Sequence, residues 1–332
     1  IYKKMEKKRV AYLDALKGLC MLIVVDGHIM TGNGFETYGS MSQQLLYAFV
    51  LPAFFFVSGF LAYKKSMTAK DVWTNISRKF TYLVIPALVF LLVSNMIKHQ
   101  NPLGILTYGM RGYWFPVVLF ECFLIYYLSV LVIKNDKLRF ALLLVLSVGG
   151  FMVTSVIKNF GPAIFDLHRL SKLFQFFAVG LLAKKYNEKY ESLMQNEIVK
   201  AASLLTFFIT LFLTTYHMNP LLHQFLRDEV MRYAGTIAVV SLFVCNEEAF
   251  KRESKIISFL NYVGRNSFAI FLLHYFFVPQ FHPRPEWFEN LNMTTVHLFS
   301  LLYALVVTGI CAIFIKLLSN SKFIRKYALG QK

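Results

Sequence analysis

The chain has 332 residues, of which 57% are hydrophobic, 17% aromatic and only 16% charged, and its mean hydropathy is +0.52. A soluble domain of this length carries far more charge, so the composition excludes an ordinary soluble enzyme. The apolar residues come in runs of about 20, the length of helix that crosses a bilayer core. We therefore predict an all-α polytopic membrane protein, since a β-barrel would show short alternating segments instead.

The net charge is +17, from 35 Lys and Arg residues against 18 Asp and Glu residues. When the helices are placed as below, most of these basic residues fall on one side of the membrane, as the positive-inside rule expects. The basic surplus therefore indicates topology and contact with anionic membrane lipids, and we predict no nucleic-acid partner. The four cysteines lie in apolar segments without metal-ligand spacing, so no metal site is predicted.

About ten transmembrane helices are expected, with the N- and C-termini both cytoplasmic and with residues 1–332 forming one integral-membrane domain. The helices are predicted near residues 10–31, 43–63, 81–98, 113–133, 139–157, 168–183, 198–217, 230–247, 267–279 and 294–316. An amphipathic cytoplasmic link precedes the third helix, which is expected to bend or break near Pro86.

The first helix carries four ionisable residues, Asp14, Lys17, Asp26 and His28. Each is costly in hydrocarbon, so each is a candidate for function. At 100° per residue, Lys17 and His28 point within about 20° of each other and lie about 16 Å apart along the axis. Asp14 shares their stripe, whereas Asp26 points almost the opposite way. A polar line is therefore predicted to cross the membrane, with His28 toward the outer face.

His28 is the leading catalytic candidate, because a neutral imidazole can accept a proton from a hydroxyl group. Asp14 and Lys17 stand at positions i and i+3, where opposite charges pair on a helix. Asp14 is a further catalytic candidate, and we expect Lys17 to bind a cofactor. A purely structural ion pair remains open for both residues.

Other ionisable residues within the predicted helices are also expected to face the interior of the bundle. Glu121, in the fourth helix, is a catalytic candidate that could orient His28 or pair with Arg169. Arg169 and Lys172 open the sixth helix, and His274 lies in the ninth. We expect these last three to contact the substrate, and the sequence does not decide which pairings form.

Three further residues are candidates for binding a nucleotide-like donor. Arg78 and Lys79 stand at the cytoplasmic entrance of the third helix, where cations could hold phosphate groups. The general tendency of Lys and Arg to flank the cytoplasmic ends of membrane helices explains these two residues equally well. In the second helix, Ser58 could hydrogen-bond across a close helix contact that Gly59 permits.

Five stretches of the chain resemble the acyltransferase-3 family and occur in the order found there. They are the Lys17 and His28 pair with ten residues between, PAFFFVSGF in the second helix, the basic segment from Arg78 to Pro86, YWFP in the fourth helix, and VGRNSFAIFLLH in the ninth. The resemblance covers nearly the whole chain, and it is strongest to the fucose 4-O-acetylase-like branch.

This resemblance implies ten core transmembrane helices and transfer of an acyl group, usually acetyl, from acyl-CoA to a carbohydrate hydroxyl. The family's catalytic histidine falls on His28, and its preceding Arg or Lys falls on Lys17. The basic motif of the third helix matches only at Arg78 and Lys79, because the second arginine of that motif is missing here.

We therefore predict a membrane-bound O-acyltransferase whose donor is acetyl-CoA or another acyl-CoA, with a cell-surface or lipid-linked carbohydrate as acceptor. His28 would act as general base or as the acyl-accepting residue. The expected location is the cell membrane, and specifically a bacterial cytoplasmic membrane, and a homo-oligomer remains open. Two alternatives also remain open: a transporter or flippase for a sugar or lipid-linked sugar, and a non-catalytic partner in polysaccharide export.

Overall fold

The computed structural model describes residues 10–35, 41–101, 109–156, 165–216, 218–252, 254–280 and 291–331, and these residues form helices, turns and bends without a strand. The longer helices are α1 (Ala11–Gly32), α2 (Met41–Ala62), α3 (Ala69–Lys79), α4 (Ile85–Ile97), α6 (Trp114–Val132), α7 (Asp136–Val156), α8 (Leu167–Lys185), α10 (Glu197–Leu213), α12 (Met231–Cys245), α14 (Lys255–Arg265) and α17 (Met293–Leu318). The shorter ones are η1 (Phe80–Val84), η3 (Arg111–Tyr113), α9 (Asn187–Met194), α11 (Pro220–Phe225), η4 (Leu226–Val230), α13 (Glu247–Lys251), α15 (Ser267–Leu273), η5 (His274–Phe276) and α18 (Lys322–Tyr327).

Each of the ten segments predicted to be helical contains a helix. Among the described residues, three helices are long and apolar enough to cross a membrane, namely Ala69–Ile97, Arg111–Val132 and Met293–Leu318. Two bent pairs, 187–213 and 255–276, raise this number to five if each pair is one span. Ten spans and cytoplasmic termini therefore remain predictions.

The predicted break near Pro86 takes the form of a π-helical turn. The chain is helical from α3 through η1 into α4, and η1 ends directly before Ile85 and Pro86. A proline has no backbone N–H, and its ring collides with the carbonyl one turn earlier in a regular α-helix. A wider π-turn relieves that collision, so the helix continues through the proline instead of ending there. The amphipathic segment expected to be a separate link is thereby joined to the third predicted helix.

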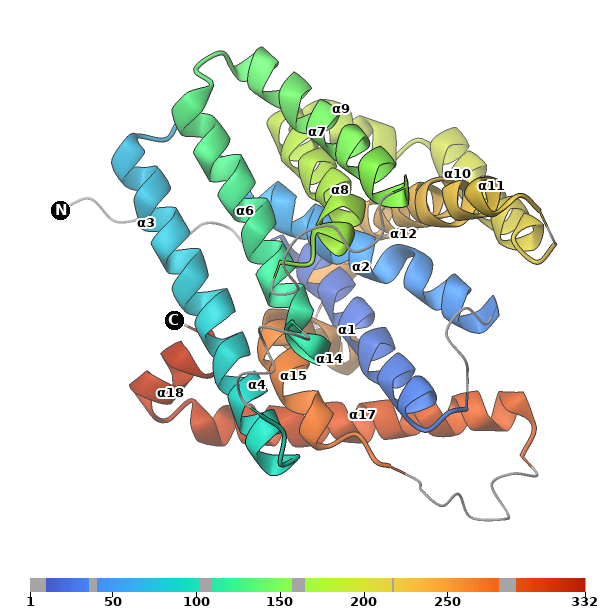
Figure 1. The fold of residues 1–332 in the computed structure, drawn as a ribbon. Coiled ribbons are helices and arrows are strands. Elements are labelled where there is room, and N and C mark those ends of the chain that lie inside the picture. The colour runs from blue at the N-terminus through green and yellow to red at the C-terminus, as the bar shows by residue number, and fades with distance from the viewer. Residues whose placement is uncertain are drawn as a thin grey trace.

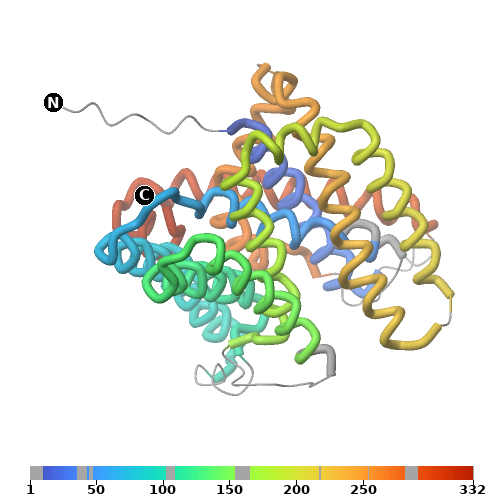
Figure 2. Tube along the Cα trace, turned by 90° about the horizontal axis from the view of Figure 1, so that it is seen from above, coloured from blue at the N-terminus to red at the C-terminus, as the bar shows by residue number. Residues whose placement is uncertain are grey.

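Helix α1 lies at the centre of the bundle (Figure 1). It packs against α14, α2 and α17, while α2 packs along α8. The continuous helix from α3 to α4 runs beside α6, and the two views agree on this arrangement (Figures 1 and 2). The ionisable residues of α1 are therefore surrounded by protein.

Glycines let the backbones of the central helices touch. A Cβ at Gly264 would lie 1.7 Å from the carbonyl oxygen of Asp14, and a Cβ at Gly59 would lie 2.0 Å from that of Phe177. No side chain fits at such distances, so these contacts require glycine. The predicted close approach at Gly59 is confirmed as a contact between α2 and α8, and Gly264 joins α14 to α1.

The bundle has two ends that can be defined from side-chain contacts. Tyr12, in the first turn of α1, has its hydroxyl 3.4 Å from the hydroxyl of Tyr190, whose ring packs on Phe56 and Phe60. The last turns of α2 therefore lie beside the first turns of α1, so these two helices are antiparallel. Lys184, near the end of α8, lies over the Phe60 ring, so α8 runs in the same direction as α2. We call these ends the Lys17 end and the His28 end.

We predict that Gly264→Ala strongly destabilises the protein. The added methyl group would overlap the backbone of α1, and overpacking of this kind costs about 1–3 kcal/mol or more. The unfolding temperature in detergent should fall by several degrees. Gly309→Ala in α17 is the matched control, because a Cβ there meets nothing within 4 Å. Equal unfolding temperatures for both variants would contradict the close contact of α1 with α14.

Candidate active site

A cavity of about 690 Å³ lies among α1, α2, α6, α8 and α15, and it extends between the two ends of the bundle. At the Lys17 end its wall includes Lys17, Ser58 and Lys79. At the other end the wall includes His28 and Arg169. The cavity therefore brings together five of the residues that the sequence singled out as site candidates.

One face of α1 forms a continuous side of this cavity. Its lining residues are Lys17, Met21, Val24, His28 and Thr31. Their spacing alternates between four and three residues, which is the spacing of a single helix face. The predicted stripe joining Lys17 to His28 is therefore confirmed as one face of a helix, although apolar side chains separate the two polar ones.

Of the two aspartates of α1, Asp26 has the position that helical phase predicts, whereas Asp14, predicted to share the stripe of Lys17 and His28, lies outside the cavity face. Asp14 pairs with Lys17, with its Oδ1 2.8 Å from Nζ, and it does not line the cavity. Asp26 faces the opposite side, where Ser300 of α17 donates a hydrogen bond of 2.6 Å to its carboxylate. The structural ion pair between Asp14 and Lys17 is thus present, while catalytic and cofactor-binding roles for them stay predictions.

His28 is held by Tyr275, a residue of η5. The Tyr275 hydroxyl lies 3.1 Å from Nε2 of His28 and 3.2 Å from the carbonyl oxygen of Gly112. A carbonyl can only accept, so the phenol satisfies both contacts by donating to Gly112 and accepting from His28. In this arrangement Nε2 of His28 carries the proton and Nδ1 keeps its lone pair. Tyr275 thereby selects the tautomer in which Nδ1 can act as a base.

The His274 ring packs next to the His28 ring, outside the cavity wall. Its side chain is fully buried and does not line the cavity, and its ring centroid lies 5.1 Å from that of His28. Its Nδ1 lies 2.7 Å from the carbonyl oxygen of Phe271, which requires a proton on Nδ1. Within the described structure, Nε2 of His274 has no hydrogen-bond partner. His274 could therefore influence a substrate only through the His28 ring, and the direct substrate contact predicted for it has no support in this structure.

At the Lys17 end, the structure separates two neighbouring basic residues. Lys79 lines the cavity, and its Nζ lies 3.6 Å from the centre of the Phe123 ring. Arg78 is exposed outside the cavity and donates to Oδ1 of Asn75 over 3.2 Å. Ser58 faces the cavity on the α2 side. Lys79 and Ser58 can therefore contact a ligand in the cavity, whereas Arg78 can reach only a group at its entrance.

At the His28 end, the two basic residues of α8 have different partners. Arg169 pairs with Asp166 and stacks over Trp114, with its guanidinium carbon 4.5 Å from the ring centre. Arg169 lines the cavity, whereas Lys172 lies behind the wall and pairs with Asp228. A direct substrate contact is therefore open to Arg169, and Lys172 supports the wall.

Glu121 does not make either of the pairings considered for it. Its carboxylate is buried in α6, outside the cavity wall, and within the described structure neither oxygen has a hydrogen-bond partner. The His28 ring is bonded to Tyr275 instead, and Arg169 pairs with Asp166. A catalytic role for Glu121 stays a prediction without a contact in this structure to support it.

Sequence reasoning missed Tyr275 and the charged group at the start of the eighth predicted helix. Arg227 and Arg232 line the cavity, and Asp228 lies between them in the chain. Ionisable residues beside a long apolar run are costly in a membrane, and this signal, which singled out the ionisable residues of α1, could also have singled out these three. Tyr275 carried no such signal, because a tyrosine in an apolar helix is ordinary.

The comparison with protein families decides the class of protein. A model of the acyltransferase-3 family, described as an acyltransferase domain, matches residues 10–316. The chain belongs to the acyltransferase-3 family. No match was found among curated proteins or among solved structures. Membership agrees with the apolar helices in indicating a membrane protein that transfers acyl groups, and placement in the fucose 4-O-acetylase-like branch stays a prediction.

We predict that Tyr275→Phe slows acyl transfer by about 10- to 100-fold, because a loosely held catalytic group loses its alignment. The ring and its packing remain, so the unfolding temperature should hardly change. Transfer of a labelled acyl group by the purified protein measures the effect. Tyr262→Phe is the control, since within the described part of the chain its hydroxyl donates to a carbonyl oxygen of α17 and to no other group. A Tyr275→Phe enzyme as fast as this control would contradict the role given to Tyr275.

Proposed function

We propose that the protein transfers an acyl group, most simply acetyl, from acyl-CoA to a hydroxyl group of a cell-surface or lipid-linked carbohydrate. The observation that carries this proposal is the single cavity that joins Lys17 and Lys79 at one end to His28 at the other. A two-substrate transfer needs such a space, because donor and acceptor must meet at one catalytic group.

The donor would enter from the Lys17 end. Lys17 and Lys79 can neutralise phosphate oxygens inside the entrance, and Arg78 stands exposed beside them. The phosphates of CoA would stay among these cations while the linear pantetheine arm extends along the α1 face. Met21 and Val24 on that face are apolar, which suits the carbon chain of the arm.

The chemistry proposed for His28 uses its unprotonated Nδ1. The acceptor hydroxyl would give its proton to Nδ1 while its oxygen attacks the thioester carbonyl. The carbon–sulfur bond then breaks, and the sulfur leaves as CoA after taking the proton back from the imidazolium. The products are the carbohydrate ester and free CoA. In the variant with an acyl-histidine, Nδ1 itself attacks the thioester and later passes the acyl group to the hydroxyl.

The two ends of the cavity would face opposite sides of the membrane. The Lys17 end carries further basic residues, among them Lys64, Lys184 and Lys185. The positive-inside rule puts such an end on the cytoplasmic side, where acyl-CoA is made. The His28 end would then face outward, toward a surface carbohydrate.

The decisive test replaces His28. Loss of a general base or nucleophile typically costs 10²- to 10⁴-fold, so His28→Ala should reduce transfer from labelled acetyl-CoA by at least about 100-fold. Cells that lack the gene would be complemented with each variant, and their surface glycans compared by mass spectrometry for the added acyl mass. Release of CoA by the purified proteins gives an independent reading.

His297→Ala provides the control, because His297 lies on α17 and does not line the cavity. It should keep both the glycan modification and CoA release. Full acyl transfer by His28→Ala would overturn the proposed mechanism. Wild-type protein that neither releases CoA nor changes any glycan would instead favour transport.

A further inference from the structure

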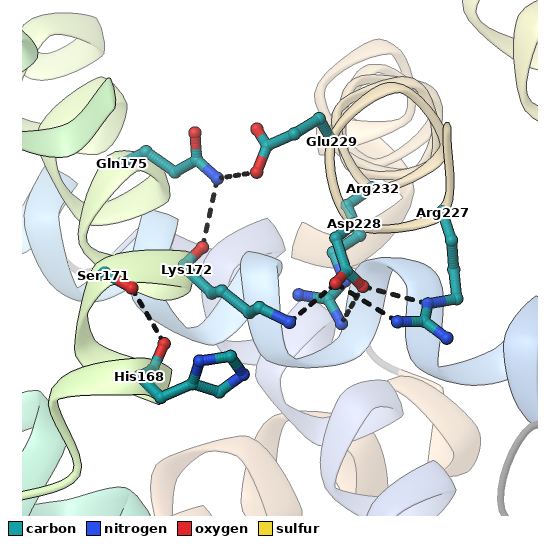
Figure 3. A network of polar contacts seen from close by, with 8 residues as sticks. All are labelled: His168, Ser171, Lys172, Gln175, Arg227, Asp228, Glu229 and Arg232. Carbon is teal, nitrogen blue, oxygen red and sulfur yellow. Dashed lines mark hydrogen bonds and ion pairs between the residues drawn. The ribbon is translucent and has the colours of Figure 1, made fainter. Parts of the chain in front are cut away.

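Three cations at the His28 end converge on one buried carboxylate (Figure 3). Lys172 of α8 has its Nζ 2.7 Å from Oδ2 of Asp228. Arg227 and Arg232 each have a guanidinium nitrogen 3.1 Å from Oδ1 of the same side chain. The Asp228 side chain is only 1% exposed. One carboxylate thus fixes the positions of three cations that come from α8, η4 and α12.

A second set of hydrogen bonds holds the same helices together. Gln175 donates to Oε1 of Glu229 over 2.8 Å and to the carbonyl oxygen of Lys172 over 3.1 Å. Tyr233 donates to Oε1 of Gln175 over 3.0 Å. Figure 3 shows Gln175 and Lys172 on one helix, facing the helix that carries Glu229 and Asp228. The cations are therefore held in place before any ligand arrives.

The charges at this end are arranged in two layers. The cations on the cavity wall are Arg169, Arg227 and Arg232. The carboxylates behind the wall are Asp166, Asp228 and Glu229. None of the described residues that line the cavity is an aspartate or a glutamate. These three cations lie on the side open to a ligand, and the carboxylates lie behind them with Lys172, so the cavity wall at this end is positive.

Guanidinium groups on the wall of a cavity favour an anionic ligand, because charge-assisted hydrogen bonds to an anion are stronger than hydrogen bonds between neutral groups. A carboxylate ligand can accept two parallel hydrogen bonds from one guanidinium group in a bidentate contact. Here three guanidinium groups line one cavity, Arg169 from α8 and Arg227 and Arg232 from the continuous helix formed by η4 and α12. A phosphate group has several acceptor oxygens that point in different directions, and it therefore fits this arrangement better.

We propose that the acceptor bears a phosphate or pyrophosphate group, which Arg227, Arg232 and Arg169 hold while the nearby hydroxyl group meets His28. This inference rests on the proposed function, because it names the class of acceptor for the same cavity. A soluble sugar phosphate and a sugar joined to a membrane lipid through phosphate both present this chemistry.

The test measures binding of inorganic pyrophosphate to the purified full-length protein in discs of uncharged lipid, without acyl-CoA. Arg227→Gln removes one guanidinium group while Lys172 and Arg232 still pair with Asp228, so the fold should persist. The dissociation constant should rise roughly tenfold, as expected for the loss of one charge-assisted contact. Arg227→Lys should restore part of the affinity, because lysine restores the positive charge but lacks the planar guanidinium group that donates two hydrogen bonds to one anion.

Lys251→Gln is the matched control, since this lysine pairs with Glu247 and Glu248 on α13 and does not line the cavity. It should bind pyrophosphate as tightly as the wild type. Unchanged binding in Arg227→Gln would overturn the inference. A loss of binding in Lys79→Gln together with none in Arg227→Gln would place the anion at the donor end and would also overturn it.

Competition identifies the source of the phosphate. Glucose 1-phosphate represents a soluble sugar phosphate, and dodecyl phosphate placed in the disc represents a lipid phosphate. Displacement of pyrophosphate by either compound supports the inference, and the stronger competitor indicates the source. Displacement by neither would overturn it, as would glucuronate competing as well as glucose 1-phosphate. Because no acyl-CoA is present, these outcomes are separate from the His28→Ala result, which tests the transfer itself.

Discussion

The burial of ionisable groups among apolar helices determines how this bundle is assembled. Each such group is costly unless a partner compensates for it, and the partners found here also build the site. Lys17 has Asp14, Asp26 has Ser300, and His28 has Tyr275. Because these partners come from α1, α17 and η5, satisfying the polar groups of α1 also fixes how the neighbouring helices surround the cavity.

The glycine contacts make these polar contacts possible. At Gly264 and Gly59 the helix backbones come closer than any side chain would permit. The close packing of α14 on α1 brings the following helix, α15, and then η5 to the His28 end of the cavity. A single tyrosine of η5 can therefore reach both the catalytic candidate and the carbonyl oxygen of Gly112. Preorganisation of this kind is what a transfer reaction needs, since it requires a fixed base between two substrates.

Much of the fold and part of the site could be predicted from the sequence, because both follow from local periodicity. Ten apolar runs became helices, and a rotation of 100° per residue separated the cavity face of α1 from the Asp26 face. Pairings between distant segments could not be predicted in this way. Tyr275 is far from His28 in the chain, and Lys172 is 56 residues from Asp228, so only the packing of helices brings them together. The π-turn before Pro86 was also missed, because a proline alone does not distinguish a break from a wider turn.

In the proposed arrangement the donor lies along the α1 face, with its phosphates at the Lys17 end and its acyl group at His28. This arrangement can be tested with a structure of the protein bound to a non-hydrolysable acetyl-CoA analogue, in which a methylene group separates sulfur from the carbonyl. We expect the analogue's carbonyl within hydrogen-bond reach of His28 and its phosphates beside Lys17 and Lys79. An analogue bound outside the cavity, or with its phosphates among the arginines of the His28 end, would contradict this arrangement.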